Sequence, residues 1–180
     1  TNGGARDEEY WAELAKVFGR MGAVIFSIDG LEDTNHLYRQ KVNWNNVMRN
    51  AKAFINAGGR ARWDFIVFKH NEHQVEEAQQ LSNDLGFETF QFKKTGRFFS
   101  TASHTGKESH QAVNKKGELT QKLEKPKDKY VNKALHKEQE LVTKHGSMDN
   151  YYKQVKIDCK VKKEKSIFIT AEGMLMPCCW

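Results

Sequence analysis

Residues 23–39 read AVIFSIDGLEDTNHLYR, and the rest of the chain is organised around this stretch. Residues 24–26 (VIF) form a short, continuous apolar run, which is typical of a strand buried on both faces. The run ends in residues 27–30 (SIDG), where small and polar side chains take over. Because ligands of parallel α/β sheets bind beyond the carboxyl ends of the strands, the sequence predicts a site at Ser27 and Asp29.

Helical and strand patterns alternate along residues 1–99. Apolar side chains recur at helical spacing in three segments, and short apolar runs separate these segments. We expect helices at 6–21, 43–57 and 74–85, strands at 23–28, 63–68 and 87–92, and the tip of a further strand at 1–4. Asn43 is a candidate N-cap of the second helix. Alternation of this kind implies parallel βαβ units and an α/β fold.

A family resemblance follows from these residues. Ser27-x-Asp29-Gly30, with Arg39 twelve residues after Ser27 and Thr1-Asn2-Gly3 upstream, resembles the middle of a radical S-adenosylmethionine (SAM) enzyme. The branch with a C-terminal SPASM or twitch extension is the most similar, and the resemblance covers most of residues 1–99 and returns at 159–180. It implies a partial parallel (β/α) barrel fragment, with strands three to six of the six-stranded barrel, and a small C-terminal β-hairpin module.

The resemblance also implies a SAM site. Ser27 and Arg39 match positions that contact the methionyl or ribose portion of SAM, and Asn2 matches a strand tip near SAM and substrate. These residue types suit the task, because a guanidinium pairs with a carboxylate and a hydroxyl both donates and accepts hydrogen bonds. Asp29 either shapes the turn or faces the substrate. The plainer alternative is a strand-ending turn at 27–30 with Arg39 as a surface charge.

The cysteines indicate a second site. The chain has three cysteines near its end, an odd number that makes a poor disulfide framework and favours a reducing, cytoplasmic setting. Cys159-x13-Gly173-x4-Cys178 resembles the opening of a SPASM or twitch domain, which implies that Cys159 and Cys178 are ligands of an auxiliary 4Fe–4S cluster. Three unremarkable cysteines remain the alternative, and a role for Cys179 stays open.

One defining motif is missing from these 180 residues. The family's Cys-x3-Cys-x2-Cys, which holds the SAM-cleaving 4Fe–4S cluster, does not occur in the sequence. We therefore expect an internal fragment of a longer enzyme, and we expect this chain alone not to generate a 5′-deoxyadenosyl radical.

The composition divides the chain into three regions. We expect the partial barrel at 1–99, a polar, Lys-rich connector or insertion at 100–150, and the start of the cluster module at 151–180. Within the polar region, few apolar positions repay the entropy of ordering, and only 133–144 has a helical pattern. In the last region we expect an extended stretch at 151–161, followed by a hairpin whose strands lie at 165–170 and 174–177.

The resemblance implies an oxidoreductase or maturase that cleaves SAM reductively and abstracts a hydrogen from a substrate, in this branch often a peptide or protein. An electron donor such as a flavodoxin or ferredoxin is the implied partner. No apolar run is long enough to span a membrane. The chain has a net charge of +6, and lysines cluster in the Lys-rich region, so we interpret the charge mostly as a source of solubility. The alternative function is a non-catalytic basic module for nucleic acid or an acidic partner, although we do not expect nucleic acid. A zinc site at His70 and His73 is a weaker alternative.

Overall fold

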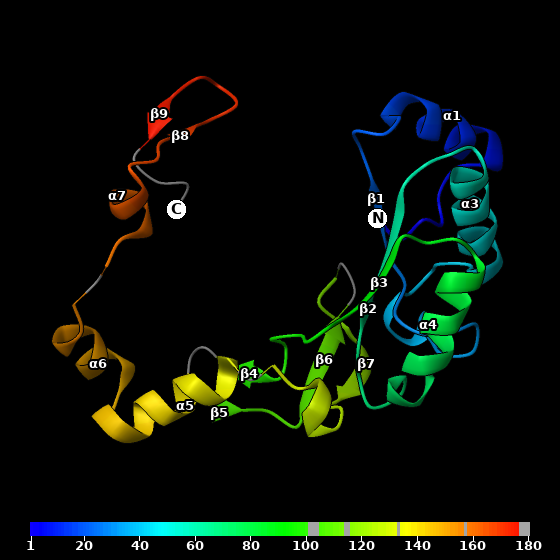
Figure 1. The fold of residues 1–180 in the computed structure, drawn as a ribbon. Helices are drawn as coiled ribbons and strands as arrows, with labels where there is room; N and C mark the ends of the chain where they lie inside the picture. The colour runs from blue at the N-terminus through cyan, green and yellow to red at the C-terminus, as the bar shows by residue number, and fades with distance from the viewer. Residues whose placement is uncertain (101–104, 114–115, 133, 157, 177–180) are drawn as a thin grey trace. The chain divides into compact units, whose positions relative to one another are not determined.

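The structure is a computed structural model that describes residues 1–100, 105–113, 116–132, 134–156 and 158–176. The chain divides into two compact units, Thr1–His136 and Lys137–Trp180 (Figure 1). The first unit thus combines the predicted 1–99 region with most of the Lys-rich segment.

Three parallel strands form the sheet of the first unit. They are β1 (Val24–Ser27), β2 (Ala61–Ile66) and β3 (Thr89–Lys93), in the order β1-β2-β3. The predicted α/β class is therefore confirmed. The Thr1 amino group donates to the Ile25 carbonyl at 3.0 Å, and the Ser27 N–H donates to the Thr1 carbonyl at 2.7 Å. This is the pattern of parallel pairing, so the start of the chain lies beside β1 as predicted.

The three predicted helices of this unit are present, with ends that differ by one to three residues from those expected. They are α1 (Glu8–Phe18), α3 (Trp44–Asn56) and α4 (Val75–Asp84), and a short α2 (Asn35–Tyr38) and a 3₁₀ turn η1 (Glu72–Gln74) lie in the connections. Asn43 caps α3, because its Oδ1 accepts from the Asn46 N–H at 3.0 Å. Asp7 caps α1 in the same way through the Tyr10 N–H.

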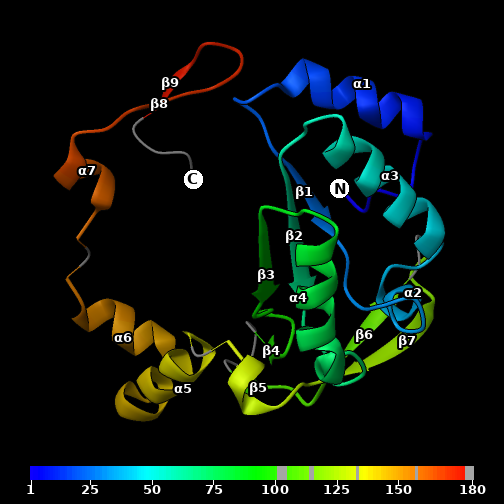
Figure 2. The ribbon, with the colours of Figure 1, turned by 45° about the vertical axis from the view of Figure 1, so that its right-hand side comes forward.

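The two faces of the sheet differ in character. The helices α1, α3 and α4 lie against one face of the sheet (Figure 2). On this face Phe26, Trp63 and Phe65 are fully buried. On the opposite face Ile25 is 44% exposed, and its register partner Arg62 is also exposed. The prediction that residues 24–26 are buried on both faces is therefore wrong at Ile25. The apolar run occurs because Val24 and Phe26 point to the core and Ile25 happens to be apolar.

The Lys-rich segment contains more structure than a connector. A pair of short strands, β4 (Phe99–Ser100) and β5 (Thr105–Gly106), precedes an antiparallel hairpin of β6 (Ser109–Val113) and β7 (Leu119–Glu124), and a 3₁₀ turn η2 (Asp128–Tyr130) follows. Leu123 is 1% exposed and packs against Phe68 and Phe98, while Tyr130 is buried in the main core. The expectation that too few apolar positions repay the entropy of ordering is wrong for the described residues 105–113 and 116–132. These few apolar side chains pack against the rest of the first unit.

The second unit is mostly helical. It contains most of α5 (Ala134–His145), α6 (Met148–Gln154), α7 (Lys160–Glu164) and a hairpin of β8 (Phe168–Ile169) and β9 (Leu175–Met176). The predicted helix at 133–144 and the predicted hairpin are confirmed. The prediction of an extended stretch at 151–161 is wrong, because Ser147 caps α6 through the Asn150 N–H at 3.1 Å and the chain turns into two short helices.

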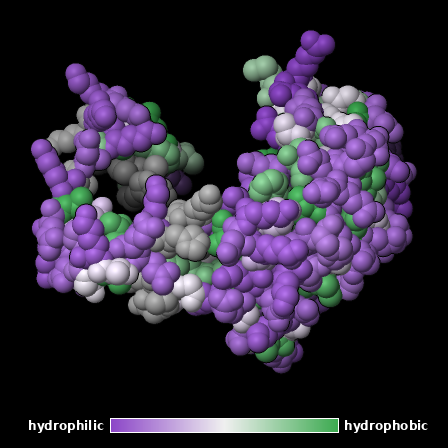
Figure 3. All heavy atoms as spheres, turned by 60° about the horizontal axis from the view of Figure 1, so that its bottom comes forward, coloured by the Kyte–Doolittle hydropathy of each residue, from purple (hydrophilic) through white to green (hydrophobic). Residues whose placement is uncertain are grey.

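The surface is largely polar. In the space-filling view, the visible faces of both units are mostly hydrophilic, and apolar side chains form small, separate patches (Figure 3). None of the helices in the described part of the chain has the length and apolar character that crossing a membrane requires.

Candidate functional site

A pocket of about 240 Å³ lies at the carboxyl ends of the three parallel strands. Its lining comes from the end of β1, the loop after α2, the end of β2 and the segment after β3: Ser27, Arg39, Asp64, Ile66, Lys93, Thr95, Gly96 and Arg97. Ser27 and Arg39 therefore share one pocket although twelve residues separate them. This is the position in which parallel α/β sheets bind ligands.

Asp29 is fully buried behind this pocket and is already bonded. Its Oδ2 accepts from Arg39 Nε at 2.5 Å, and its Oδ1 accepts from the Ile66 N–H at 2.5 Å. Burial raises the pKa of the Asp29 carboxyl, and the Arg39 guanidinium opposes this increase. Because both oxygens have partners and no part of the side chain is exposed, Asp29 acts as a positioning residue that holds Arg39 and the turn.

Two buried amides fix the turn after β1. Asn35 Oδ1 accepts from the Asp29 N–H at 2.9 Å, and Asn71 Nδ2 donates to the Asp29 carbonyl at 2.9 Å. Gly30 has a φ of 149°, and a Cβ there would lie 2.3 Å from Thr34 Oγ1, so this position requires glycine. Sequence reasoning identified Gly30 but missed Asn35 and Asn71, because polar residues in loops are normally taken as solvent-exposed.

Tyr38 organises the cationic side of the pocket. The guanidinium carbons of Arg39 and Arg97 lie 5.2 and 5.3 Å from the centre of the Tyr38 ring. The ring itself packs against Phe68 at 4.8 Å between centroids. Cation–π contacts of this kind orient a guanidinium without neutralising its charge. Two arginines from different loops are therefore held at one aromatic ring beside the pocket.

The uncovered face of the sheet leads into this pocket. Ser27 pairs in register with Asp64, and Asp64 pairs with Gln91, so these three side chains form one row across β1, β2 and β3. Lys93 Nζ lies 3.2 Å from an Asp64 carboxylate oxygen and donates to Gln91 Oε1 at 2.9 Å. The row combines a hydroxyl, a carboxylate and an amide, and the Lys93 ammonium group contacts two of its members. Sequence reasoning singled out only Ser27, because the other members depend on the strand register.

The remaining predicted site residues are not brought into the pocket. Asn2 is exposed, its Oδ1 accepts from the Gly4 N–H at 3.1 Å, and it does not line the pocket. Cys159 is an exposed free thiol at the start of α7, and Cys178 lies outside the described residues. Among the side chains that the structure describes, no group of three or more His, Cys, Asp or Glu residues could hold a metal ion.

The histidines after β2 are not part of a three-residue ligand group among the described residues. His70 stacks on Phe68 with ring centroids 5.5 Å apart, and its Nε2 is buried without a hydrogen-bond partner among the described atoms. Burial, together with the nearby His73 and His36, lowers the pKa of His70. These contacts favour a neutral ring that packs in the first unit.

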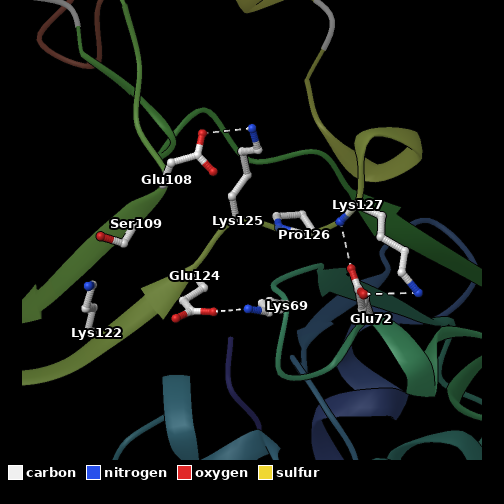
Figure 4. Close-up of a pocket in the computed structure, with 9 residues that line it drawn as sticks. All are labelled: Lys69, Glu72, Glu108, Ser109, Lys122, Glu124, Lys125, Pro126 and Lys127. Carbon is white, nitrogen blue, oxygen red and sulfur yellow. Dashed lines mark hydrogen bonds and ion pairs between the residues drawn. The ribbon is translucent and has the colours of Figure 1, made fainter.

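A second, larger pocket of about 490 Å³ lies between the base of the β6–β7 hairpin and the loop after β2 (Figure 4). Its charges are largely paired. Lys69 bonds to Glu124, Lys125 lies 3.1 Å from Glu108, and both the backbone N–H and the ammonium group of Lys127 reach Glu72, at 2.7 and 3.4 Å respectively. The Lys69–Glu124 and Lys127–Glu72 pairs join the hairpin segment to the connection after β2, and Lys125–Glu108 joins the two ends of the hairpin segment.

Comparison of the chain with protein-family models, with curated proteins and with solved structures gave no match.

Proposed function

We propose that the first unit is the SAM-binding part of a radical SAM oxidoreductase or maturase, and that the strand-end pocket takes the methionyl end of SAM. One observation carries this proposal: the Ser27 hydroxyl and the Arg39 guanidinium line one pocket at the carboxyl ends of parallel strands. Arg39 is not a free surface charge, because the buried Asp29 holds its guanidinium beside this pocket.

The chemistry of the lining suits an amino-acid head group. Arg39 offers N–H donors to a carboxylate, and the Ser27 hydroxyl serves a carboxylate or an ammonium group. Asp64 is paired with Lys93, and it serves a ligand ammonium group only by sharing or exchanging that partner. The volume of about 240 Å³ is below the roughly 300–1,000 Å³ of pockets that enclose whole drug-sized ligands. We therefore assign only the methionyl end to the pocket, and the adenosine extends over the uncovered face.

The polar face supports the proposal of a partial barrel. Parallel sheets are normally covered on both faces and carry apolar side chains on both. Here one face carries mostly polar side chains, beside Ile25 and Ile66: Ser27, Arg62, Asp64, Gln91 and Lys93. Such a face suits the interior of a barrel that encloses a polar ligand.

In radical SAM enzymes a 4Fe–4S cluster supplies the electron that cleaves SAM, and the resulting radical removes a hydrogen from the substrate. The residues of this chain do not fit that cluster, because its three-cysteine motif does not occur in the sequence. Cys159 and Cys178 are proposed only as ligands of an auxiliary cluster. The role assigned to these residues is therefore SAM binding, within an enzyme that acts on a peptide or protein in the cytoplasm with a flavodoxin- or ferredoxin-type donor.

The alternative of a basic binding module has less support. Three lysines around the hairpin pocket (Lys69, Lys125 and Lys127) are paired with glutamates, which lowers the charge that this surface offers to an acidic partner.

Equilibrium dialysis with isotope-labelled SAM tests the proposal on the chain as it stands. We expect saturable binding that Ser27→Ala weakens by about 3- to 10-fold, the value of one hydrogen bond. Arg39→Lys keeps the charge but loses the planar fork, so it should also weaken binding. Lys16→Ala, on the outer surface of α1, is the control and should bind as the unmodified chain does. Absence of saturable binding, or equal binding by all four proteins, would contradict the proposal.

A further inference from the structure

Arg97 differs from the other cations of the strand-end pocket. Arg39 bonds to the buried Asp29, and Lys93 pairs with Asp64. For Arg97 the described part of the chain offers no carboxylate within ion-pair distance. Its Nη1 donates to the Thr95 hydroxyl at 3.0 Å, and this acceptor is neutral, so the bond does not form an ion pair.

The guanidinium of Arg97 is nevertheless held in place. The Tyr38 ring lies 5.3 Å from its central carbon, and Thr95 Oγ1 accepts from both the side chain and the backbone N–H of Arg97. A side chain restrained on two sides loses less conformational entropy when a ligand binds. The charge of Arg97 also acts on two neighbouring groups. Together with burial it lowers the pKa of His110, and it opposes the increase that burial causes in the pKa of Asp29.

An oriented guanidinium on the wall of a pocket is the chemistry that recognises an oxyanion. The two carboxylates nearest the pocket do not serve it: Asp29 is sealed behind Arg39, and Asp64 is bonded to Lys93. Among the residues that the structure describes, hydrogen-bonding capacity on Arg97 therefore remains for a further group.

We propose that Arg97 binds a carboxylate or phosphate group of the substrate, which is therefore acidic where it lies beside the segment after β3. The description of this ligand as a substrate rests on the proposed function, whereas the oxyanion site rests on the geometry of Arg97 alone. The SAM head group is left to Ser27 and Arg39, so the two ligands occupy separate parts of one pocket.

The test uses acetate and inorganic phosphate as separate probes, titrated into ¹⁵N-labelled chain at constant ionic strength. We expect the backbone amide NMR signals of Gly96 and Arg97 to shift, and the titrations to give millimolar dissociation constants. The probe that binds more tightly, acetate or phosphate, shows whether the site prefers a carboxylate or a phosphate. Arg97→Gln should weaken binding at least 10-fold, and Arg97→Lys should weaken it less. The matched control is Arg62→Gln. It also removes one arginine charge, but from the uncovered face of the sheet outside the pocket, and it should change binding less than 2-fold.

Each outcome decides the inference. Equal loss in Arg97→Gln and Arg62→Gln, or no loss in Arg97→Gln, overturns the oxyanion site. In dialysis against labelled SAM, Arg97→Gln should bind SAM as the unmodified chain does. If the variant loses SAM binding, Arg97 serves the SAM carboxylate, and the proposal of an acidic substrate is wrong. If the unmodified chain binds the probes through Arg97 but does not bind SAM, the oxyanion site stands and the proposed function fails. Thermal melting confirms that each variant is folded.

Discussion

Asp29→Asn probes the part of the structure that fixes the site. Asp29 is fully buried, and it receives hydrogen bonds from Arg39 Nε and the Ile66 N–H, each at 2.5 Å. Asparagine keeps the size of the side chain and the acceptor for Ile66. It loses the charge, and its amide N–H₂ faces the Arg39 donor where an acceptor stood.

The expected cost in the free energy of unfolding is about 3 kcal/mol. Removal of one partner from a buried ion pair costs about 3–5 kcal/mol. The lower end applies because the Arg39 side chain is 25% exposed, so water solvates part of the stranded charge. A domain of this size has roughly 5–15 kcal/mol of stability in total, so the effect is large.

Urea unfolding followed by tryptophan fluorescence measures this cost. Trp11, Trp44 and Trp63 all lie in the first unit, and Trp180→Phe in every protein confines the signal to that unit. Glu13→Gln breaks the exposed pair with Lys16 and should cost about 0.5 kcal/mol or less. If Asp29→Asn also costs less than about 1 kcal/mol, Asp29 does not hold the turn and Arg39 as described.

Three further predictions follow from the same structure. Burial lowers the pKa of His70 below 6.5 in the folded chain, so the unfolded chain binds protons more readily and the free energy of unfolding falls on acidification from about pH 7. His70→Phe should reduce this fall, measured by urea unfolding at pH 7.5 and 5.5. An equal fall in the variant and the unmodified chain would disprove the role of His70. Leu123→Ala should cost about 2–3 kcal/mol and speed tryptic cleavage in the β6–β7 hairpin, whereas the exposed Leu119→Ala should do neither. Incubation of the chain with SAM and dithionite should yield no 5′-deoxyadenosine, because the cluster motif does not occur in the sequence. Formation of 5′-deoxyadenosine would contradict the inference that this chain alone does not cleave SAM.

Periodicity was enough to predict the three long helices and the three sheet strands of the first 99 residues, although one strand was misplaced and the predicted strand tip at 1–4 is not a strand. Residues 63–68 were predicted, but β2 is Ala61–Ile66. The apolar run continues because Val67 and Phe68 are buried in the turn after the strand. Apolar sequence marks burial, and burial does not always coincide with strand pairing.

Features that depend on register or on single side chains could not be predicted. The row of Ser27, Asp64 and Gln91 follows only from the pairing of β1, β2 and β3. The β6–β7 hairpin docks largely through Leu123, and one leucine among many charged residues gives no periodic signal. The Arg39–Asp29 bond was also missed: Arg39 was expected to contact SAM, and Asp29 was expected either to shape the turn or to face the substrate.

A crystal structure of the chain grown with SAM tests the central claim most directly. The account predicts that the methionyl group lies in the strand-end pocket, with its carboxylate at Arg39 and the Ser27 hydroxyl within hydrogen-bond distance. SAM bound anywhere else, such as the pocket between Lys69 and Lys122, or no SAM at saturating concentration, would contradict it.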